Sequence, residues 1–324
     1  MKALRCHAFG PVGHLAVEDI ASPIPGPQQA VVTVKAAGVN FPDTLIVQGK
    51  YQIKPELPFT PGAEFAGVVK AVGEGVSNVK PGDAVFGVGV TGGFAEEALI
   101  DAANLVPLPE GADFDVASAL TMAYGTSLHA LKDRARLARG ETLVVLGAGG
   151  GVGLAAVEIG KLLGATVVAA ASTEAKLDVC RARGADATIN YDREDLKERI
   201  RALTAGRGAD VVYDPVGGAY TAATSRCVGW NGRYLIVGFA AGEIPSVPFN
   251  LPLLKGYSIV GVHWGGFVQR EPAANAANMS LLMDWIVSGK LAPLISARYP
   301  LTRAVDALLA MMRREVAGKV VVVP

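Results

Sequence analysis

The sequence has few of the residues that build disulfide frameworks, metal cages or membrane anchors. Its 324 residues include three cysteines, Cys6, Cys180 and Cys227, which are scattered without paired spacing. This count fits a reducing compartment and leaves little material for a metal site. No apolar run reaches about 18 residues, and the first residues lack the apolar core of a signal peptide. We therefore expect no membrane span and no secretion signal.

An excess of charge of either sign is also absent, because 30 basic side chains balance 30 acidic ones. This balance gives no bulk electrostatic basis for binding nucleic acid or an anionic membrane. We expect a cytoplasmic protein with a small-molecule substrate. The length of the chain predicts two domains with a large core.

Glycine is plentiful, with 39 residues, and it is concentrated after one apolar run. Residues 143–146 have strand character, small residues follow at 147–153, and a helical pattern continues to Gly164. Strand, glycine turn and helix in this order aim backbone N–H groups and the positive end of a helix at one point, which suits a pyrophosphate. The pattern A-x-G-x-x-G falls on Ala148, Gly150 and Gly153, with Gly151 and Val152 between them. It predicts dinucleotide binding, and a merely structural turn is the alternative.

From about residue 120 strands and helices alternate. The strands are expected at 143–146, 166–171, 187–189, 210–213, 234–237 and 258–262, with helices near 151–164, 174–183, 193–204 and 219–228. Six strands with crossovers of this length predict an α/β fold with a doubly wound, parallel, six-stranded Rossmann sheet.

Residues 1–119 show short apolar stretches, at 31–37, 66–72, 84–88 and 94–100, separated by Pro and Gly signals. This spacing predicts an antiparallel, partly closed barrel. Two amphipathic helices near 275–288 and 302–314 and a strand at 319–323 follow the last Rossmann strand. We predict a substrate domain made of 1–119 and 263–324, with the dinucleotide-binding domain, 120–262, inserted between them.

The second strand of the Rossmann unit points to the kind of nucleotide. NAD-binding units usually place an Asp or Glu at the end of this strand. Here the strand ends in Ser172 and Thr173, Lys176 follows one helical turn later, and Tyr191, after the third strand, is placed to lie over an adenine. Hydroxyls, a lysine and no acid favour NADPH. Glu174 would oppose a 2′-phosphate if it turned inward, whereas a first-turn helix acid would not. A plain helix N-cap at Ser172 or Thr173, and a solvated helix face for Lys176, are the alternatives, and each is compatible with the cofactor role.

Five segments carry a wider pattern, which reads AGVNFPD at 37–43, PGAEFAGVV at 61–69, GT at 125–126, the glycine motif at 148–153 and GKVVV at 318–322. Together they resemble the medium-chain dehydrogenase/reductase superfamily and, within it, the zinc-free quinone oxidoreductases that include zeta-crystallin. The resemblance covers essentially the whole chain. It implies a GroES-like substrate domain beside the Rossmann domain.

The same two N-terminal motifs differ from those of the zinc alcohol dehydrogenases of this superfamily. Those relatives carry Cys at the position of Asn40 and His at the position of Ala63, and neither Asn nor Ala replaces a thiolate and an imidazole on zinc. Without a Lewis acid to hold an alkoxide, alcohol–carbonyl interconversion is not expected. The resemblance then implies no metal and hydride transfer to an electron-poor acceptor, which needs orientation more than acid–base chemistry.

The resemblance also assigns roles to single residues. It places Asn40 in the substrate cleft as a hydrogen-bond donor, Tyr51 as a cleft residue that orients or protonates the product, and Thr126 against the nicotinamide ribose or amide. A loop-capping asparagine and a half-buried tyrosine are the alternatives. Asp43 and Glu64 are interpreted as a helix cap and a supporting carboxylate. Further cofactor contacts are expected from Gly238, Phe239, His263 and Trp264 and, at the adenosine phosphate, from Arg314 and Lys319.

Three functions remain open at this point. The first is an NADPH-dependent reductase of quinones, the second is an NADPH-dependent reductase of activated alkenes such as enones, alkenals or enoyl thioesters, and the third is a cofactor-binding structural protein of the crystallin kind. We also expect a homodimer, because residues 257–262 would form an uncovered apolar edge of the sheet.

Overall fold

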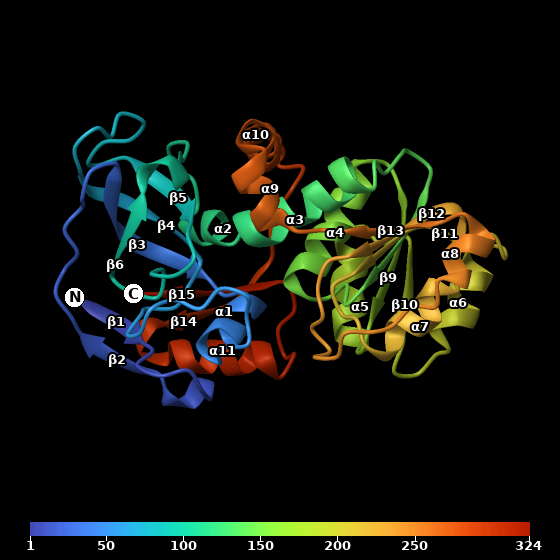
Figure 1. The fold of residues 1–324 in the computed structure, drawn as a ribbon. Helices are drawn as coiled ribbons and strands as arrows, with labels where there is room; N and C mark the ends of the chain where they lie inside the picture. Colours follow the sequence, from blue (N-terminus) through green and yellow to red (C-terminus); the bar gives the residue numbers. More distant parts are fainter. The chain divides into compact units, whose positions relative to one another are not determined.

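The computed structural model describes all residues from 1 to 324, and they form two compact units. Unit 1 consists of Met1–Met122 and Pro293–Pro324, and unit 2 consists of Ala123–Ala292. Figure 1 labels the helices and strands of both. Each unit has its own sheet and its own core.

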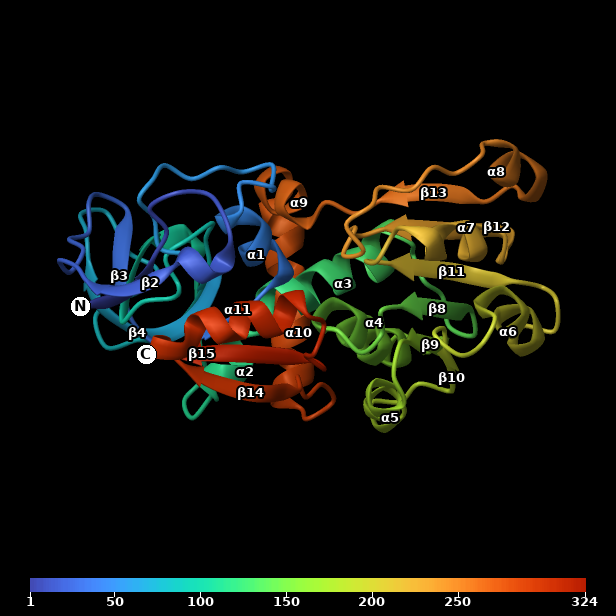
Figure 2. The ribbon, with the colours of Figure 1, turned by 90° about the horizontal axis from the view of Figure 1, so that it is seen from below.

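Unit 2 contains a six-stranded, fully parallel sheet. Its strands lie in the order β10 (Ala187–Asn190), β9 (Thr166–Ala171), β8 (Thr142–Leu146), β11 (Ala209–Asp214), β12 (Val228–Ile236) and β13 (Ser258–Gly261), as Figure 2 shows. The strand order reverses between β8 and β11, and ligands of doubly wound folds bind at such a switch point. The predicted Rossmann sheet is confirmed.

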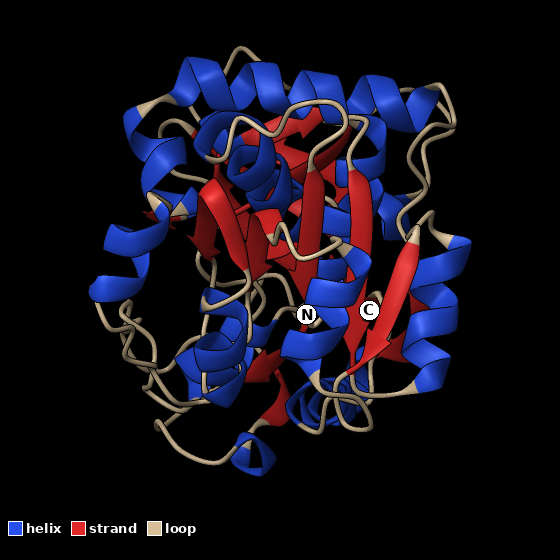
Figure 3. Ribbon diagram, turned by 90° about the vertical axis from the view of Figure 1, so that its right-hand side faces the viewer, coloured by secondary structure: helices blue, strands red, loops and turns tan.

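Helices connect these strands and lie around the sheet (Figure 3). They are α4 (Gly151–Leu162), α5 (Glu174–Ala182), α6 (Leu196–Leu203), α7 (Ala219–Ser225) and the short α8 (Asn250–Lys255). Because the sheet is covered on both faces, β8 and β9 are almost entirely apolar and buried, with Val144, Leu146 and Val168 in the core.

Residues 263–292 belong to unit 2, a different grouping from the one expected from the sequence. They form α9 (Trp264–Arg270) and α10 (Pro272–Val287), next to the π-helical turns η3 (Thr121–Gly125) and η4 (His129–Arg134) that flank α3 (Thr126–Leu128). The ring of Phe267 stacks on His129 at 3.9 Å, and Lys132 donates a 2.9 Å hydrogen bond to Asn278. These contacts hold both helices to unit 2.

Unit 1 contains a seven-stranded sheet in the order β14 (Ile295–Pro300), β15 (Lys319–Val323), β3 (Gln29–Gly38), β4 (Glu64–Val72), β5 (Ala84–Val88) and β7 (Leu105–Pro107), with β6 (Glu97–Asp101) also paired to β3. A separate hairpin joins β1 (Lys2–Arg5) and β2 (Ala16–Asp19). All pairs in the sheet are antiparallel except β14 with β15. The predicted β-rich domain is present, and its sheet does not close into a barrel.

Three helices complete unit 1: α1 (Phe41–Val47), α2 (Phe114–Ser118) and α11 (Ala304–Met312). Helix α11 packs on α1 and along β14 and β15, and its buried residues Ala307 and Leu308 join Val32 and Phe65 in the core (Figures 1 and 2). Single 3₁₀ turns, η1 (Val12–His14), η2 (Ala102–Asn104) and η5 (Leu301–Arg303), link the remaining strands. Nowhere in the chain is a helix both long and apolar enough to cross a membrane.

Candidate active site

The loop between β8 and α4 has the geometry that a pyrophosphate requires. Gly147 has a φ of +57°, and a Cβ on Gly153 would lie 2.3 Å from the Gly147 carbonyl oxygen, so only glycine lets the helix approach the strand this closely. Gly150 is the N-cap of α4. The first-turn N–H groups of Gly151, Val152 and Gly153 have no acceptor within the helix, which makes this end of α4 a site for an anion.

Lys176 lies across this loop at Gly149. A Cβ on Gly149 would be 2.6 Å from Cβ of Lys176, 2.9 Å from its Cγ and 3.1 Å from its Cδ. The missing side chain at position 149 therefore makes room for the lysine stem, which lies beside the phosphate loop. The sequence motif treats position 149 as variable, so sequence reasoning missed this glycine.

The segment after β9 shows how Glu174 is held. Thr173 is the N-cap of α5, and its hydroxyl oxygen accepts a 3.4 Å hydrogen bond from the Lys176 N–H, while Ser172 is half-buried. The Glu174 carboxylate accepts hydrogen bonds from Asn190 (2.8 Å) and Arg181 (3.3 Å). The hydrogen bond from Asn190, then that from Arg181, lowers the pKa of Glu174. The charge of Glu174 is therefore compensated by Arg181.

The aromatic ring expected over the adenine has a partner that the sequence did not indicate. Tyr191 follows β10 directly, is half-buried and packs against Tyr220 of α7 with 4.5 Å between the ring centroids. The two rings form an apolar surface at the carboxyl end of the sheet, where a doubly wound fold binds the adenosine.

Thr126 is held beside the phosphate loop by its neighbour. It is half-buried at the start of α3, and the buried Ser127 donates a 2.9 Å hydrogen bond to the carbonyl oxygen of Val152 in the first turn of α4. The Ser127 hydroxyl also lies 2.9 Å from that of Tyr213 on β11. Burial raises the pKa of Tyr213 well above its usual range, so this phenol stays protonated. Sequence reasoning missed both hydroxyls, because each lies in an apolar segment.

Asp214 organises the turn after β11. One carboxylate oxygen accepts hydrogen bonds from the N–H groups of Val216 and Gly217, both at 2.8 Å. The other accepts from the Thr221 hydroxyl at 2.9 Å and from the Tyr234 hydroxyl at 2.6 Å. A buried carboxylate with four donors fixes the backbone around it. This turn lies at the carboxyl edge where the cofactor contacts are expected.

Gly238 and Phe239 lie next to that turn. The Gly238 N–H donates to the Asp214 carbonyl oxygen at 3.3 Å, and a Cβ on Gly217 would be 2.9 Å from the Phe239 ring. Phe239 is 37% exposed and lines a small cavity of about 120 Å³ together with Tyr234. The cavity is too small for a nucleotide.

His263 and Trp264 follow β13 in opposite environments. The His263 side chain is exposed, whereas Trp264 is 7% exposed and packs on Gly125, where a Cβ would lie 3.0 Å from the indole ring. The indole Nε1 is buried without a hydrogen-bond acceptor. An unsatisfied buried donor next to Thr126 is a feature that a bound ligand would explain.

In unit 1, Asn40 belongs to a buried polar cluster with Glu64 and Lys319. The Lys319 ammonium donates to the Glu64 carboxylate at 2.7 Å, to Oδ1 of Asn40 at 2.6 Å and to the Val39 carbonyl oxygen at 3.1 Å. The Asn40 amide donates to the same Glu64 oxygen at 2.9 Å, and the other Glu64 oxygen accepts from the Met122 N–H at 2.8 Å.

This cluster changes the interpretation of Lys319. The family resemblance implies a role at the adenosine phosphate, but Lys319 is 2% exposed and its three donors are already bonded to three acceptors within unit 1. No donor is left for a phosphate, so the role expected from the resemblance does not fit this geometry. Arg314, the other residue expected there, is exposed in unit 1 just after α11 and has a φ of +58°.

Asp43 and Tyr51 lie beside this cluster. One oxygen of the Asp43 carboxyl group accepts a 2.8 Å hydrogen bond from the Asn40 N–H and so caps α1, as the sequence suggested, while the other is buried without a donor. Burial, opposed by the Asn40 hydrogen bond and the Lys319 charge, raises the pKa of Asp43 to about 7. Tyr51 is half-buried against the core of unit 1, and burial followed by the charge of Asp43 raises its pKa.

The predicted site residues thus form two groups, each inside its own unit. Unit 2 holds the phosphate loop, Lys176, Tyr191, Thr126 and the ends of β12 and β13, and unit 1 holds Asn40, Tyr51, Arg314 and Lys319. Within the whole chain, no group of three or more His, Cys, Asp and Glu side chains is arranged to hold a metal ion.

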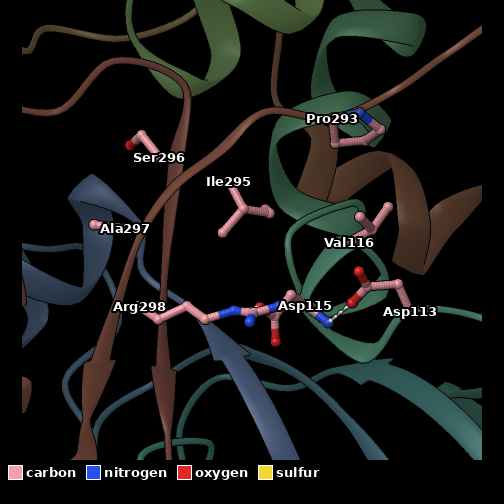
Figure 4. A pocket seen from close by; sticks show the side chains of 8 residues that line it. All are labelled: Asp113, Asp115, Val116, Pro293, Ile295, Ser296, Ala297 and Arg298. Carbon is pink, nitrogen blue, oxygen red and sulfur yellow. Dashed lines mark hydrogen bonds and ion pairs between the residues drawn. The ribbon is translucent and has the colours of Figure 1, made fainter.

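A larger hollow in unit 1, of about 450 Å³, contains none of these residues (Figure 4). It is open to solvent and lies between α2 and β14, with Val116 and Ile295 on its walls. Its charged side chains already have partners within unit 1. Arg298 forms an ion pair with Asp115, and the Asp113 carboxylate accepts a 2.8 Å hydrogen bond from the Asp115 N–H. This hollow offers no group for hydride chemistry.

Two family models match this chain, one mainly in each unit. Residues 26–110 match the family model described as the alcohol dehydrogenase GroES-like domain, and residues 151–281 match that described as zinc-binding dehydrogenase. The quinone oxidoreductase-like protein 2 homolog of Nematostella vectensis is 39% identical over 99% of this chain and 88% of its own length.

Solved structures of related proteins match the fold of this chain over nearly its full length. The quinone oxidoreductase of Escherichia coli in complex with NADPH is 28% identical, covers 100% of both chains and superimposes with a TM-score of 0.93. The enoyl reductase CurK is 26% identical, with a TM-score of 0.89 over 99% of this chain and 98% of its own. The chain belongs to the zeta-crystallin-like quinone oxidoreductase group of the medium-chain dehydrogenase/reductase superfamily.

Proposed function

We propose that this protein is an NADPH-dependent, zinc-independent oxidoreductase that transfers hydride to quinones or related electron-poor acceptors. The observation that carries the proposal is the phosphate loop at 147–153 with Lys176 seated in the space left by Gly149. Within unit 2 this arrangement places a basic residue of α5 beside the anion site at the start of α4.

The residues of unit 2 fit a bound NADPH. The N–H groups at the start of α4 would hold the pyrophosphate, Lys176 and Ser172 the 2′-phosphate, and Tyr191 the adenine. Thr126, Trp264 and the backbone at Gly238 and His263 would contact the nicotinamide end. In this position the cofactor would supply a hydride, and with one proton from solvent this would convert a quinone to a hydroquinone and leave NADP⁺.

The residues proposed to bind the hydride acceptor lie in unit 1. Asn40 would donate a hydrogen bond to an acceptor oxygen as negative charge grows on it, and Tyr51 would orient the ring. Zinc independence is proposed because the Asn40 amide and the Ala63 methyl group stand where zinc-dependent relatives have a thiolate and an imidazole. Hydride transfer to a quinone needs orientation and charge stabilisation and no Lewis acid.

The test is NADPH oxidation, followed by its absorbance, with 1,4-benzoquinone and 9,10-phenanthrenequinone, in parallel with NADH and after treatment with a chelator. We expect faster turnover with NADPH than with NADH, and no loss after metal removal. Tight NADPH binding without turnover of any acceptor would refute the proposal and favour the structural, crystallin-like alternative.

A second candidate, reduction of activated alkenes, is supported by the likeness to the enoyl reductase CurK over 99% of this chain. A coenzyme A thioester would require a basic rim, and Lys50 and Lys54 in the segment 47–58 and Arg270 at the end of α9 offer only a thin one. An enone and enoyl thioester series in the same assay discriminates, since the preferred acceptor class has the higher kcat/KM.

We also propose that the protein is a cytoplasmic homodimer. The edge of the unit 2 sheet is β13, whose Ile259 and Val260 are only half-buried, and the nearby segment exposes Phe249, Leu253 and Leu254. An open apolar edge of this kind favours pairing with a second copy.

A further inference from the structure

We infer that Lys319 is a positioning residue for the acceptor site, whose buried ammonium orients and polarises the Asn40 amide. This inference rests on the proposed function. It replaces the phosphate-binding role that the sequence suggested for Lys319. Its basis is the geometry of the cluster formed by Asn40, Glu64 and Lys319 in unit 1.

The two charged partners dictate which way the Asn40 amide faces. An ammonium group only donates and a carboxylate only accepts, so the amide oxygen must face Lys319 at 2.6 Å and the amide nitrogen must face Glu64 at 2.9 Å. One N–H of the amide is used by Glu64. The other has only the Gly38 carbonyl oxygen at 3.4 Å, a weak contact that an acceptor oxygen can replace.

The position of the ion pair indicates more than a contribution to stability. The side chains of Lys319 and Glu64 are 3% and 1% exposed, and burial of two charges costs several kcal/mol each before their attraction offsets it. Apolar side chains of similar volume often fill such a space with equal or better stability. A cation kept at this cost beside Asn40 is therefore better explained by what it does to the amide.

The room for this cluster is built into the backbone. A Cβ on Gly38 would lie 2.6 Å from the Glu64 carboxylate and 2.3 Å from the Ser118 carbonyl oxygen, so β3 needs a glycine there to seat Glu64. The positive charge of Lys319 draws electron density toward the amide oxygen and makes the remaining N–H a better donor. That donor is strongest when the acceptor oxygen becomes negative, which lowers the barrier for hydride transfer.

The discriminating experiment compares Lys319→Met with the double variant Lys319→Met/Glu64→Gln. The single variant leaves Glu64 buried without its cation, so both its melting temperature and its activity should fall. The double variant removes both charges with side chains of similar size. We expect it to recover the melting temperature and the NADPH dissociation constant, while kcat with 1,4-benzoquinone stays lower by about tenfold or more. Lys2→Met, which breaks the exposed Lys2–Asp19 pair of the same unit, is the matched control and should change none of these.

A second arm keeps the test decisive if the double variant folds poorly. In an Asn40→Ala background, Lys319→Met should cause no further loss of kcat, because the cation acts through the amide. Recovery of kcat together with stability in the double variant, or additive losses in the Asn40→Ala background, would overturn the inference alone. A folded wild-type protein that reduces no acceptor would overturn the proposed function and this inference with it.

Discussion

Replacement of Gly149 by alanine should change which nucleotide the protein uses. The new Cβ would lie 2.6 Å from Cβ of Lys176, whereas carbon atoms in contact lie about 3.5 to 4.0 Å apart. The obstructing atom is fixed to the backbone of α5, so a rotamer change of Lys176 does not relieve the clash. The lysine must retreat from the loop by about 1 Å.

The effect on NADPH follows from Coulomb's law. An ammonium about 4 Å from one negative charge gains about 4 kcal/mol at an effective dielectric constant of about 20, and a retreat of about 1 Å loses about 0.8 kcal/mol. A phosphate carries nearly two charges at neutral pH, so the loss is about 1.5 kcal/mol. We therefore expect kcat/KM for NADPH to fall about tenfold, with little change for NADH.

Gly150→Ala is the matched control in the same loop. Its Cβ would meet only the Gly147 carbonyl oxygen, at 3.5 Å, and would not touch Lys176. It stands where the pyrophosphate approaches, so it should weaken NADPH and NADH to the same extent. Steady-state kinetics with both nucleotides give the ratio for each variant. An unchanged NADPH-to-NADH ratio in Gly149→Ala, or in Lys176→Ala, would remove Lys176 from the 2′-phosphate site.

Three further outcomes are expected. The pKa of Asp43 is about 7 in the folded state and about 4 in the unfolded state, so the folded state binds more protons between these pH values. Its stability therefore falls as the pH rises through this window, by at most about 1.4 kcal/mol per pH unit. Asp43→Asn should raise the melting temperature at pH 8 and leave it nearly unchanged at pH 4, and equal shifts at both pH values would contradict this. Ser127→Ala should raise KM for NADPH and NADH alike, because the hydrogen bond from α3 to α4 is lost while Lys176 stays in place. A change in the ratio of the two KM values would show that Ser127 does not act through Thr126. Val260→Lys on β13 should give a monomeric mass by light scattering if the sheet edge joins two copies, and an unchanged dimer would move the interface elsewhere.

The fold could be predicted from the sequence because its signals are local. The expected strands at 84–88 and 319–323 coincide with β5 and β15, and the crossovers between strands dictate the sheet order around β8. The expected strand at 234–237 was too short, since β12 begins at Val228. Gly229, Asn231 and Gly232 in that stretch are typical of a turn, and Asn231 has a φ of +57°. The pairing of β12 with β11 passes from Val228 directly to Arg233, so these residues form an irregularity within the strand.

The candidate site was less accessible to sequence reasoning, because its contacts join distant residues. Lys319 stands among valines of a closing strand, and its partner Glu64 is 255 residues away. Nothing local shows that the ammonium turns inward rather than toward a phosphate. The same holds for Gly149, whose importance lies in the side chain of Lys176 rather than in its own loop.

The separation of the predicted residues into two self-contained units has a consequence for how their effects combine. The contacts of Gly149 and Lys176 described here lie within unit 2, and those of Asn40, Glu64 and Lys319 lie within unit 1. Substitutions that share no contacts usually act independently. Gly149→Ala should therefore alter the nucleotide ratio without changing kcat at saturating NADPH, and Lys319→Met/Glu64→Gln should lower kcat without altering that ratio. A combined variant should show both effects multiplied. Strong coupling between them would mean that nucleotide selection and acceptor activation depend on one shared structure, and the assignment of one role to each unit would then be wrong.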